Sequence, residues 1–178
     1  MDFGSHRVVI LSDTHGSLHD AVLRSCDGAD YIIHAGDVGA EDILTNLSAI
    51  APMMAVFGNV DHRDIAPIRA RAQIGRWRTL TQHIVWAKDG PSGEVRDLLS
   101  GENIDLLIFG HTHQPLCWQE GGVVFCNPGS CGPRRFSMPQ SYAEAILGPE
   151  EGIFRIFDLE GIAPGRVIFT KRYHRGGV

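Results

Sequence analysis

Short apolar runs alternate with amphipathic segments through the first sixty residues of the chain. We expect buried strands at three of these runs, Arg7 to Ser12, Tyr31 to Ala35 and Met53 to Phe57. Between them, apolar residues recur at helical spacing, first over Leu18 to Leu23 and then over Glu41 to Ile50. Strands that alternate with short helices predict right-handed βαβ units and a largely parallel sheet.

The rest of the chain contains more strand patterns. Four further apolar segments predict strands, the last two as a closing antiparallel pair: Trp77 to His83, Asp105 to Phe109, Ile153 to Leu159 and Val167 to Tyr173. Leu116 to Glu120 and Val123 to Cys126 flank Gly121-Gly122, which is typical of a two-residue hairpin. The chain therefore begins with βαβ units and ends with hairpins.

Two segments in the middle have weaker patterns. Pro67 to Arg76 carries three arginines and few apolar residues, so we interpret it as a surface crossing. Pro91 to Ser100 predicts a helix, with Pro91 near the first turn and Gly101 just past the end.

Length and composition restrict the class of protein. The chain has 178 residues, of which 43% are hydrophobic, so we expect a single globular domain over residues 1–178. Sixteen basic and 21 acidic residues give a net charge of −5, which argues against a protein that coats nucleic acid through a basic surface. No apolar run reaches the roughly 20 residues of a membrane-spanning helix. No signal-peptide pattern and no disulfide framework are evident, so a cytoplasmic protein is predicted.

Potential metal ligands follow the predicted strands. They lie in the loops where five strands end, and they are Asp13, His15, Asp37, Asn59, His83, His111 and His113. Because ligands collect at the carboxyl ends of parallel strands, we expect these side chains to converge on one edge of the sheet. Crowded carboxylates repel one another, and divalent cations relieve that repulsion. A mixed nitrogen and oxygen set suits Mn, Fe, Co, Ni or Zn better than Ca.

Each of these residues also has a purely structural interpretation. An Asp or Asn after a strand is commonly a turn former or a helix N-cap, and two histidines alone are as often surface residues as ligands. Only the joint placement at the strand ends favours a metal site. Asp61 is expected to shape its loop and His34 to pack or support the site. Cys117 and Cys126 are expected to face one another as thiols.

The ordered motif blocks resemble those of the calcineurin-like metallophosphoesterases. The blocks are Asp13-Thr14-His15-Gly16, His34-Ala35-Gly36-Asp37, Gly58-Asn59-Val60-Asp61 and Gly110-His111-Thr112-His113. Asn127-Pro128-Gly129-Ser130 followed by Pro133-Arg134 narrows the resemblance to the small prokaryotic phosphodiesterase branch, which is related to the scaffold subunit of the retromer complex. The resemblance implies an α/β fold, a β-sandwich of two mixed sheets flanked by helices, and it places the Asn127 turn against the metal cleft.

The resemblance also implies roles for the ligands. Asp13, His15 and His113 would hold one divalent transition-metal ion, and Asn59, His83 and His111 the second, with Asp37 bridging the two. Manganese is the first expectation, and Fe, Zn, Ni and Co are the others. Asn59, His111 and Asp37 would also act in catalysis, the first two by contact with a phosphoryl oxygen. Two positions depart from the family pattern: Ile84 stands where a glycine usually follows the histidine, and Val60 stands where larger members have a histidine that assists the leaving group.

The implied activity is that of a hydrolase, a metal-dependent phosphodiesterase in which a hydroxide held by the two metals attacks phosphorus. The expected partner is a small phosphodiester or nucleotide-like substrate, with no membrane and no stable nucleic-acid complex. Two alternatives stay open, a partner-binding scaffold on the same fold and a small nuclease. By analogy with the family, a homodimer or homotetramer is expected.

Overall fold

Two mixed β-sheets face each other in the computed structural model, which describes residues 4–87, 90–134, 137–159 and 166–176. The six-stranded sheet has the order β13-β12-β11-β1-β2-β3 and the five-stranded sheet the order β4-β5-β8-β10-β9. The first sheet contains β1 (His6–Leu11), β2 (Tyr31–His34), β3 (Met53–Ala55), β11 (Ser141–Leu147), β12 (Glu151–Asp158) and β13 (Arg166–His174). The second contains β4 (Arg69–Ile74), β5 (Trp77–Gln82), β8 (Leu106–Ile108), β9 (Leu116–Glu120) and β10 (Val123–Asn127).

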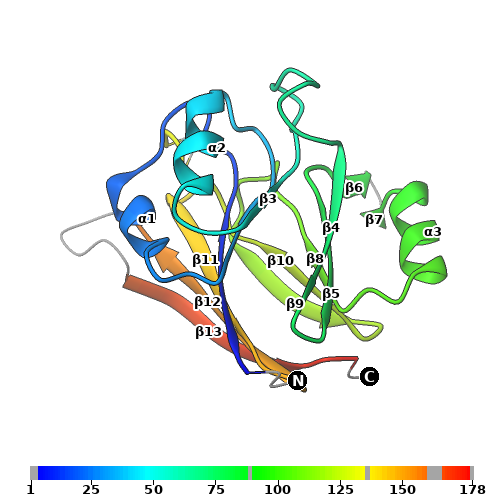
Figure 1. Ribbon diagram of the computed structural model, residues 1–178. Coiled ribbons are helices and arrows are strands. Elements are labelled where there is room, and N and C mark those ends of the chain that lie inside the picture. The colour runs from blue at the N-terminus through cyan, green and yellow to red at the C-terminus, as the bar shows by residue number, and fades with distance from the viewer. Residues whose placement is uncertain (1–3, 88–89, 135–136, 160–165, 177–178) are drawn as a thin grey trace.

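Within the residues that the structure describes, three helices lie on the outer faces of this sandwich, as can be followed in Figure 1. Helices α1 (Asp20–Ser25) and α2 (Glu41–Ser48) lie on the six-stranded sheet, and α3 (Gly93–Gly101) lies on the five-stranded sheet. A short pair, β6 (Trp86–Ala87) and β7 (Gly90–Pro91), precedes α3. In the described part of the chain, no helix combines the length and the apolar character that crossing a bilayer requires. The predicted fold class, an α/β sandwich of two mixed sheets flanked by helices, is confirmed.

Both faces of β1 are buried, which explains its unbroken apolar sequence. Val8 and Ile10 point between the two sheets, where they pack with Trp77 and Leu106 from the opposite sheet. Val9 and Leu11, which point to the other face of β1, pack against the helices α1 and α2. A third cluster joins the five-stranded sheet to α3. The strands that carry the candidate ligands are therefore held on both sides.

The prediction of a largely parallel sheet holds only for part of the molecule. Strands β1, β2 and β3 pair in parallel, as do β5, β8 and β10, whereas β11, β12 and β13 pair antiparallel. No strand was predicted for Ser141–Leu147, yet β11 pairs with β1 in the middle of the sheet. The sequence of β11 lacks a clear strand pattern, because it contains alanines and the charged Glu144. In the fold, Glu144 can be buried because its carboxylate pairs with Arg7 and Arg155 from neighbouring strands.

Of the two predictions for the middle of the chain, the surface crossing was wrong, and the helix was confirmed with its ends shifted by one or two residues. Pro67 to Arg76 is not a surface crossing, because it contains the edge strand β4, whose small residues Ala70 and Ala72 pack on the core while Arg71 between them is exposed. Helix α3 begins after Ser92, whose Oγ accepts a hydrogen bond from the Val95 amide, and it includes Gly101. Pro91 belongs to β7.

The predicted hairpin is confirmed, with β9 and β10 joined through Gly121 and Gly122, both at positive φ as a type I′ turn requires. Cys117 and Cys126 are direct partners across this hairpin, and both are buried free thiols.

An ion pair between the buried Asp105 and the partly exposed Arg78 joins β5 to the start of β8. The Asp105 carboxylate is 1% exposed and accepts hydrogen bonds from the Arg78 backbone amide at 2.9 Å and from the guanidinium Nε at 2.7 Å. Burial alone would raise the pKa of Asp105, but the hydrogen bonds from Arg78 hold this pKa below its ordinary value.

Asp105→Asn should therefore lower the free energy of unfolding by about 1–3 kcal/mol near pH 7. The substitution removes the negative charge to which the Arg78 guanidinium and backbone amide donate their hydrogen bonds. The stabilising effect of a depressed carboxyl pKa is present above the unfolded pKa and is lost as the pH falls through the folded value. The difference between wild type and variant should thus shrink below about pH 4. Urea unfolding across a pH series measures it. Glu151→Gln is the control. It breaks an exposed ion pair with Arg172 and should change the free energy of unfolding little. An equal loss of stability in both variants would contradict the prediction.

Candidate metal centre

Loops from both sheets meet at one end of the sandwich. The loops after β1, β2 and β3 come from the six-stranded sheet, and those after β5 and β8 come from the five-stranded sheet. Backbone hydrogen bonds tie the loops within a sheet, such as Asp13 N to Gly36 O at 2.9 Å. The His111 amide donates to Asp13 Oδ2 at 3.2 Å and so links the two sheets. The candidate ligands thus gather between the two sheets. The predicted arrangement, along one edge of a single sheet, was wrong in this respect.

The backbone of this region is strained. Among the described residues, every non-glycine residue at positive φ is a candidate ligand: Asp13 (56°), His15 (48°), Asp37 (52°), His111 (70°) and His113 (56°). The left-handed region costs an L-residue roughly 1–2 kcal/mol. Aspartate and histidine tolerate it better than most residues, and such strain concentrates at functional sites.

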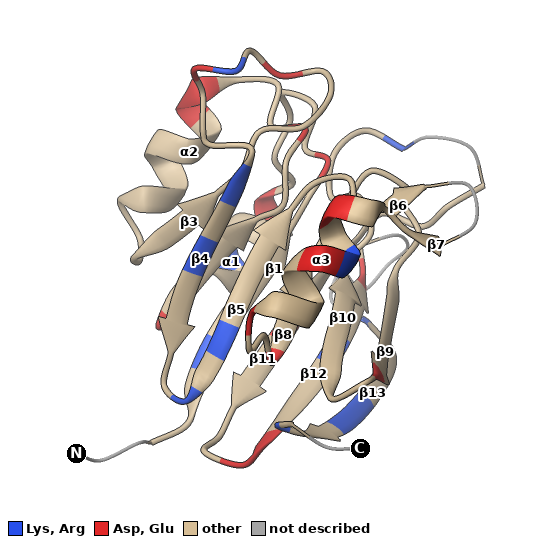
Figure 2. Ribbon diagram, turned by 90° about the vertical axis from the view of Figure 1, so that its right-hand side faces the viewer, with Lys and Arg blue, Asp and Glu red and all other residues tan. Residues whose placement is uncertain are grey.

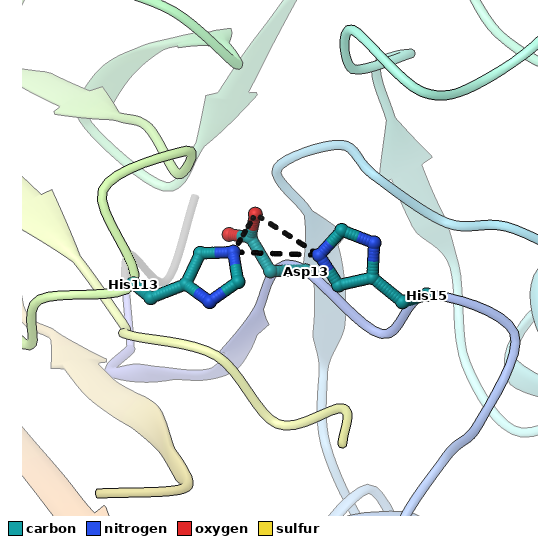
Figure 3. A group of neighbouring side chains, drawn as sticks. All are labelled: Asp13, His15 and His113. Carbon is teal, nitrogen blue, oxygen red and sulfur yellow. Dashed lines mark hydrogen bonds and ion pairs between the residues drawn. The ribbon is translucent and has the colours of Figure 1, made fainter. Parts of the chain in front are cut away.

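Asp13, His15 and His113 form a first group of potential ligand atoms (Figure 3). The His113 Nε2 lies 3.1 Å from Asp13 Oδ1, and the His15 Nε2 lies 3.9 Å from the same oxygen. The two imidazole Nε2 atoms are 3.3 Å apart. Two nitrogens and one carboxylate oxygen therefore face a common point, as in a transition-metal site.

Asp13, Asp37 and His83 form a second group that overlaps the first. The His83 Nε2 lies 3.3 Å from Asp37 Oδ1 and 4.0 Å from Asp13 Oδ1. The other Asp37 oxygen, Oδ2, lies 3.8 Å from His15 Nε2. Asp37 thus faces residues of both groups, while Asp13 belongs to both. Ile84 after His83 does not keep this histidine away from the carboxylates.

Asn59 and His111 lie beside these groups and outside both of them. His111 Nδ1 is 2.8 Å from Asn59 Oδ1, and the His111 ring packs edge-on against the His83 ring at a centroid distance of 5.5 Å. Both residues are exposed. The structure therefore brings five of the seven candidates into two overlapping groups and leaves the remaining pair, hydrogen-bonded to each other, at the open side.

The buried atoms of the two groups fit a bound cation. Asp13 Oδ1 and His83 Nε2 are fully buried and have no hydrogen-bond partner. An unpaired buried polar atom costs about 1–3 kcal/mol, so such atoms call for a partner. His83 Nδ1 lies 2.7 Å from the Ala35 carbonyl oxygen, which assigns its proton to Nδ1 and leaves the Nε2 lone pair facing the carboxylates.

The local charges also favour a cation. Burial alone would raise the pKa of Asp37, but the His83 imidazole 3.3 Å away, the hydrogen bond from the Val60 amide and the nearby His15 lower this pKa, so the carboxylate is ionised. Burial opposes protonation of His83, yet the two carboxylates raise the pKa of this histidine above its ordinary value. Protons and metal therefore compete for His83, and metal affinity should rise with pH.

Neighbouring polar residues hold the groups in place. Ser12 Oγ donates to Asp13 Oδ2 at 2.6 Å, and Ser130 Oγ donates to the Asp13 carbonyl at 2.9 Å. Asn127 Nδ2 donates to the Gly110 carbonyl at 3.0 Å. The turn at Asn127 thus abuts the site, as the resemblance implied. Sequence reasoning missed Ser12, because a serine at the end of a strand carries no distinctive signal.

Close packing explains the glycines that precede the candidate ligands. A Cβ on Gly58 would collide with the Asp37 carboxylate. A Cβ on Gly36 would lie 2.7 Å from the His83 ring, and Gly36 also has a positive φ of 96°. Only glycine lets these loops approach so closely.

His34 and Asp61 support the loops, as predicted. The His34 Nε2 is 2.9 Å from Thr14 Oγ1, and burial lowers the pKa of His34 to about 4, so the ring is neutral near pH 7. The Asp61 carboxylate accepts hydrogen bonds from three backbone amides, those of Val38, Gly39 and Gly58.

Known proteins resemble this chain in sequence and in fold. The profile described as the calcineurin-like phosphoesterase superfamily domain matches residues 7–147. A probable metallophosphoesterase of Methanothermobacter thermautotrophicus is 35% identical over 146 residues, covering 78% of this chain and 85% of that protein. The Escherichia coli phosphodiesterase YfcE is 28% identical over 157 residues, covering 76% of this chain and 85% of that protein. The structure of Vps29 from Cryptosporidium parvum superimposes with a TM-score of 0.81 at 18% identity, covering 96% and 99% of the two chains.

The family likeness agrees with the geometry, since it covers the loops that bring Asp13, Asp37 and the histidines together. Because the profile extends over most of the sequence, the chain belongs to the calcineurin-like phosphoesterase superfamily.

Proposed function

We propose that this protein is a metal-dependent phosphodiesterase that uses two divalent transition-metal ions. The observation that carries the proposal is that two buried atoms without a hydrogen bond, Asp13 Oδ1 and His83 Nε2, lie within two overlapping groups of potential ligands. Membership of a phosphoesterase superfamily and a relative named as a phosphodiesterase support the reaction class.

The residues present allow an assignment of ligands. Asp13, His15 and His113 would hold one ion, Asn59, His83 and His111 the second, and Asp37 would contact both. Nitrogen and carboxylate ligands suit Mn, Fe, Zn, Ni or Co, and the family resemblance puts Mn first among them. When bound, such a pair of ions lowers the pKa of a water molecule and neutralises the phosphoryl oxygens as charge develops.

The chain's own residues orient the reaction. The Asp37 carboxylate is fixed by the Val60 amide at 3.1 Å, and His83 is fixed through the Ala35 carbonyl. Asn59 and His111 are exposed at the open side of the groups, where an incoming phosphoryl group would meet them. Water supplies the attacking oxygen, so no side chain needs to form a covalent intermediate.

The proposed substrate is a small phosphodiester with an acidic leaving group. Val60, which is 53% exposed next to Asn59, offers no proton to a departing alcohol. An acidic leaving group needs no such proton, because it departs as a stable anion.

The two other candidate functions have less support. A scaffold that only binds a partner gains nothing from buried atoms left unpaired, which cost stability. A nuclease would bind the backbone of a nucleic acid through unpaired basic side chains. Figure 2 marks basic residues along β4 and acidic residues on α3. The side chains of Arg69 and Arg71 on β4 pair with Glu94 and Glu102. We propose further that the protein works in the cytoplasm as a homodimer or homotetramer without a stable nucleic-acid complex.

Asp37→Asn should reduce hydrolysis of bis(4-nitrophenyl) phosphate with added Mn at least about 100-fold, because the residue loses a charged ligand shared by both ions. Release of 4-nitrophenolate measures the rate. Asp97→Asn changes an exposed carboxylate on α3 and should keep full activity. Undiminished turnover in Asp37→Asn, or in protein stripped by a strong chelator, would refute the proposal.

His83→Gln should reduce the bound metal from two equivalents to one, because it removes a ligand nitrogen from only one of the two groups. Elemental analysis of dialysed protein measures the stoichiometry. The first equivalent should stay bound through Asp13, His15 and His113. Two retained equivalents would show that His83 holds no metal, and thermal unfolding of the stripped variant checks that it still folds.

A further inference from the structure

A cavity of about 190 Å³ opens directly beside the candidate metal centre. It lies between the loop after β3 and the loop after β5, and its walls include Asn59 and His83 of the site. The remaining walls are largely apolar, with Phe57, Ile68 and Ile84. A molecule held at the metal centre therefore has an apolar compartment within reach.

The aliphatic side chains of this cavity face water. Ile68 is 57% exposed and Ile84 is 39% exposed, both high values for isoleucine. Covering such surface releases about 25 cal/mol for each Å² of apolar area removed from water. Exposed apolar surface next to a polar site is a common mark of ligand binding.

Hydrogen bonds form these walls in advance. The Phe57 amide donates to the Pro67 carbonyl at 3.0 Å, which closes the loop that brings Ile68 to the cavity. Gln82 Nε2 donates to the Ile84 carbonyl at 2.8 Å. A cavity that exists before binding costs the ligand little ordering free energy.

Two polar side chains of the cavity, Gln82 and Asn59, already form hydrogen bonds within the protein. Gln82 Oε1 accepts a hydrogen bond from Arg69 Nε at 2.8 Å, while its amide nitrogen serves Ile84. Asn59 Oδ1 is paired with His111. We therefore expect the cavity to discriminate between ligands by their shape and apolar contact, and not by hydrogen bonds to polar atoms of the ligand.

The size of the cavity matches one flat ring system. An engineered apolar cavity of about 150 Å³ holds one benzene molecule, whereas drug-sized ligands occupy about 300–1,000 Å³. We infer that the Phe57–Ile68–Ile84 cavity binds an aromatic ring carried on one ester oxygen of the substrate, so that the substrates are phosphodiesters with an aryl or nucleobase group. The phosphate half of this inference rests on the proposed function, and the ring half rests on the cavity alone.

Binding of the ring can be tested without metal or turnover. Metal-free protein with 13C-labelled isoleucine methyl groups is titrated with adenosine, an uncharged probe that the carboxylates do not repel. The δ1 methyl resonances of Ile68 and Ile84 should shift upfield in a saturable way, because ring currents act on methyl groups that face a ring. Ile50, which is 38% exposed just after α2, should not shift. Ribose, which lacks the ring, is the ligand control. Unmoved Ile68 and Ile84 resonances, or equal shifts at Ile50, would overturn the inference.

Kinetics test the role of the cavity in substrate choice. In Ile68→Ala and Ile84→Ala, KM for bis(4-nitrophenyl) phosphate should rise about tenfold, which corresponds to about 1.4 kcal/mol of lost apolar contact. Ile50→Ala matches Ile84 in exposure and should leave KM unchanged. An unchanged KM in both cavity variants would contradict the inference. If the wild-type protein has no activity, the proposed function fails, while the adenosine titration still decides whether the cavity binds a ring.

Discussion

The burial of one carboxylate, that of Asp13, constrains the whole functional end of the molecule. This side chain is 0% exposed, and a buried charge is tolerated only where it is paired or bonded. Its Oδ2 accepts hydrogen bonds from Ser12 and from the His111 amide of the opposite sheet. Its Oδ1 has no hydrogen-bond partner and faces the imidazoles of both ligand groups. The two sheets therefore meet around a buried carboxylate and imidazoles that together could hold a cation.

The layered core allows the loops to hold this arrangement. Because β1 is packed on one face by the opposite sheet and on the other by α1 and α2, the end of the strand cannot relax away from the site. That rigidity keeps Asp13, Asp37 and three histidines at positive φ, a conformation that they would leave in a looser loop. The packing free energy of the apolar layers thus offsets the cost of holding these polar residues in a strained backbone conformation.

Strands with two apolar faces could be predicted from the sequence. Strands that pack through alanines or through a neutralised charge could not. Strands β1, β2 and β8 were evident because both of their faces are apolar. Strand β4 was missed because alanine is a weak apolar signal beside arginines. Strand β11 was missed because its buried Glu144 looks polar until Arg7 and Arg155, distant in sequence, are seen to neutralise it.

The amino-acid sequence alone determined the kinds of ligand, their order along the chain and their positions at strand ends, because strand periodicity and motif spacing are local properties. Only the tertiary structure decided that Asp13 would belong to two groups, that Asn59 would pair with His111, and that Ile68 and Ile84 would form a cavity beside His83. These features depend on distances between residues far apart in the chain. Such distances follow from how two sheets pack, which no local pattern encodes.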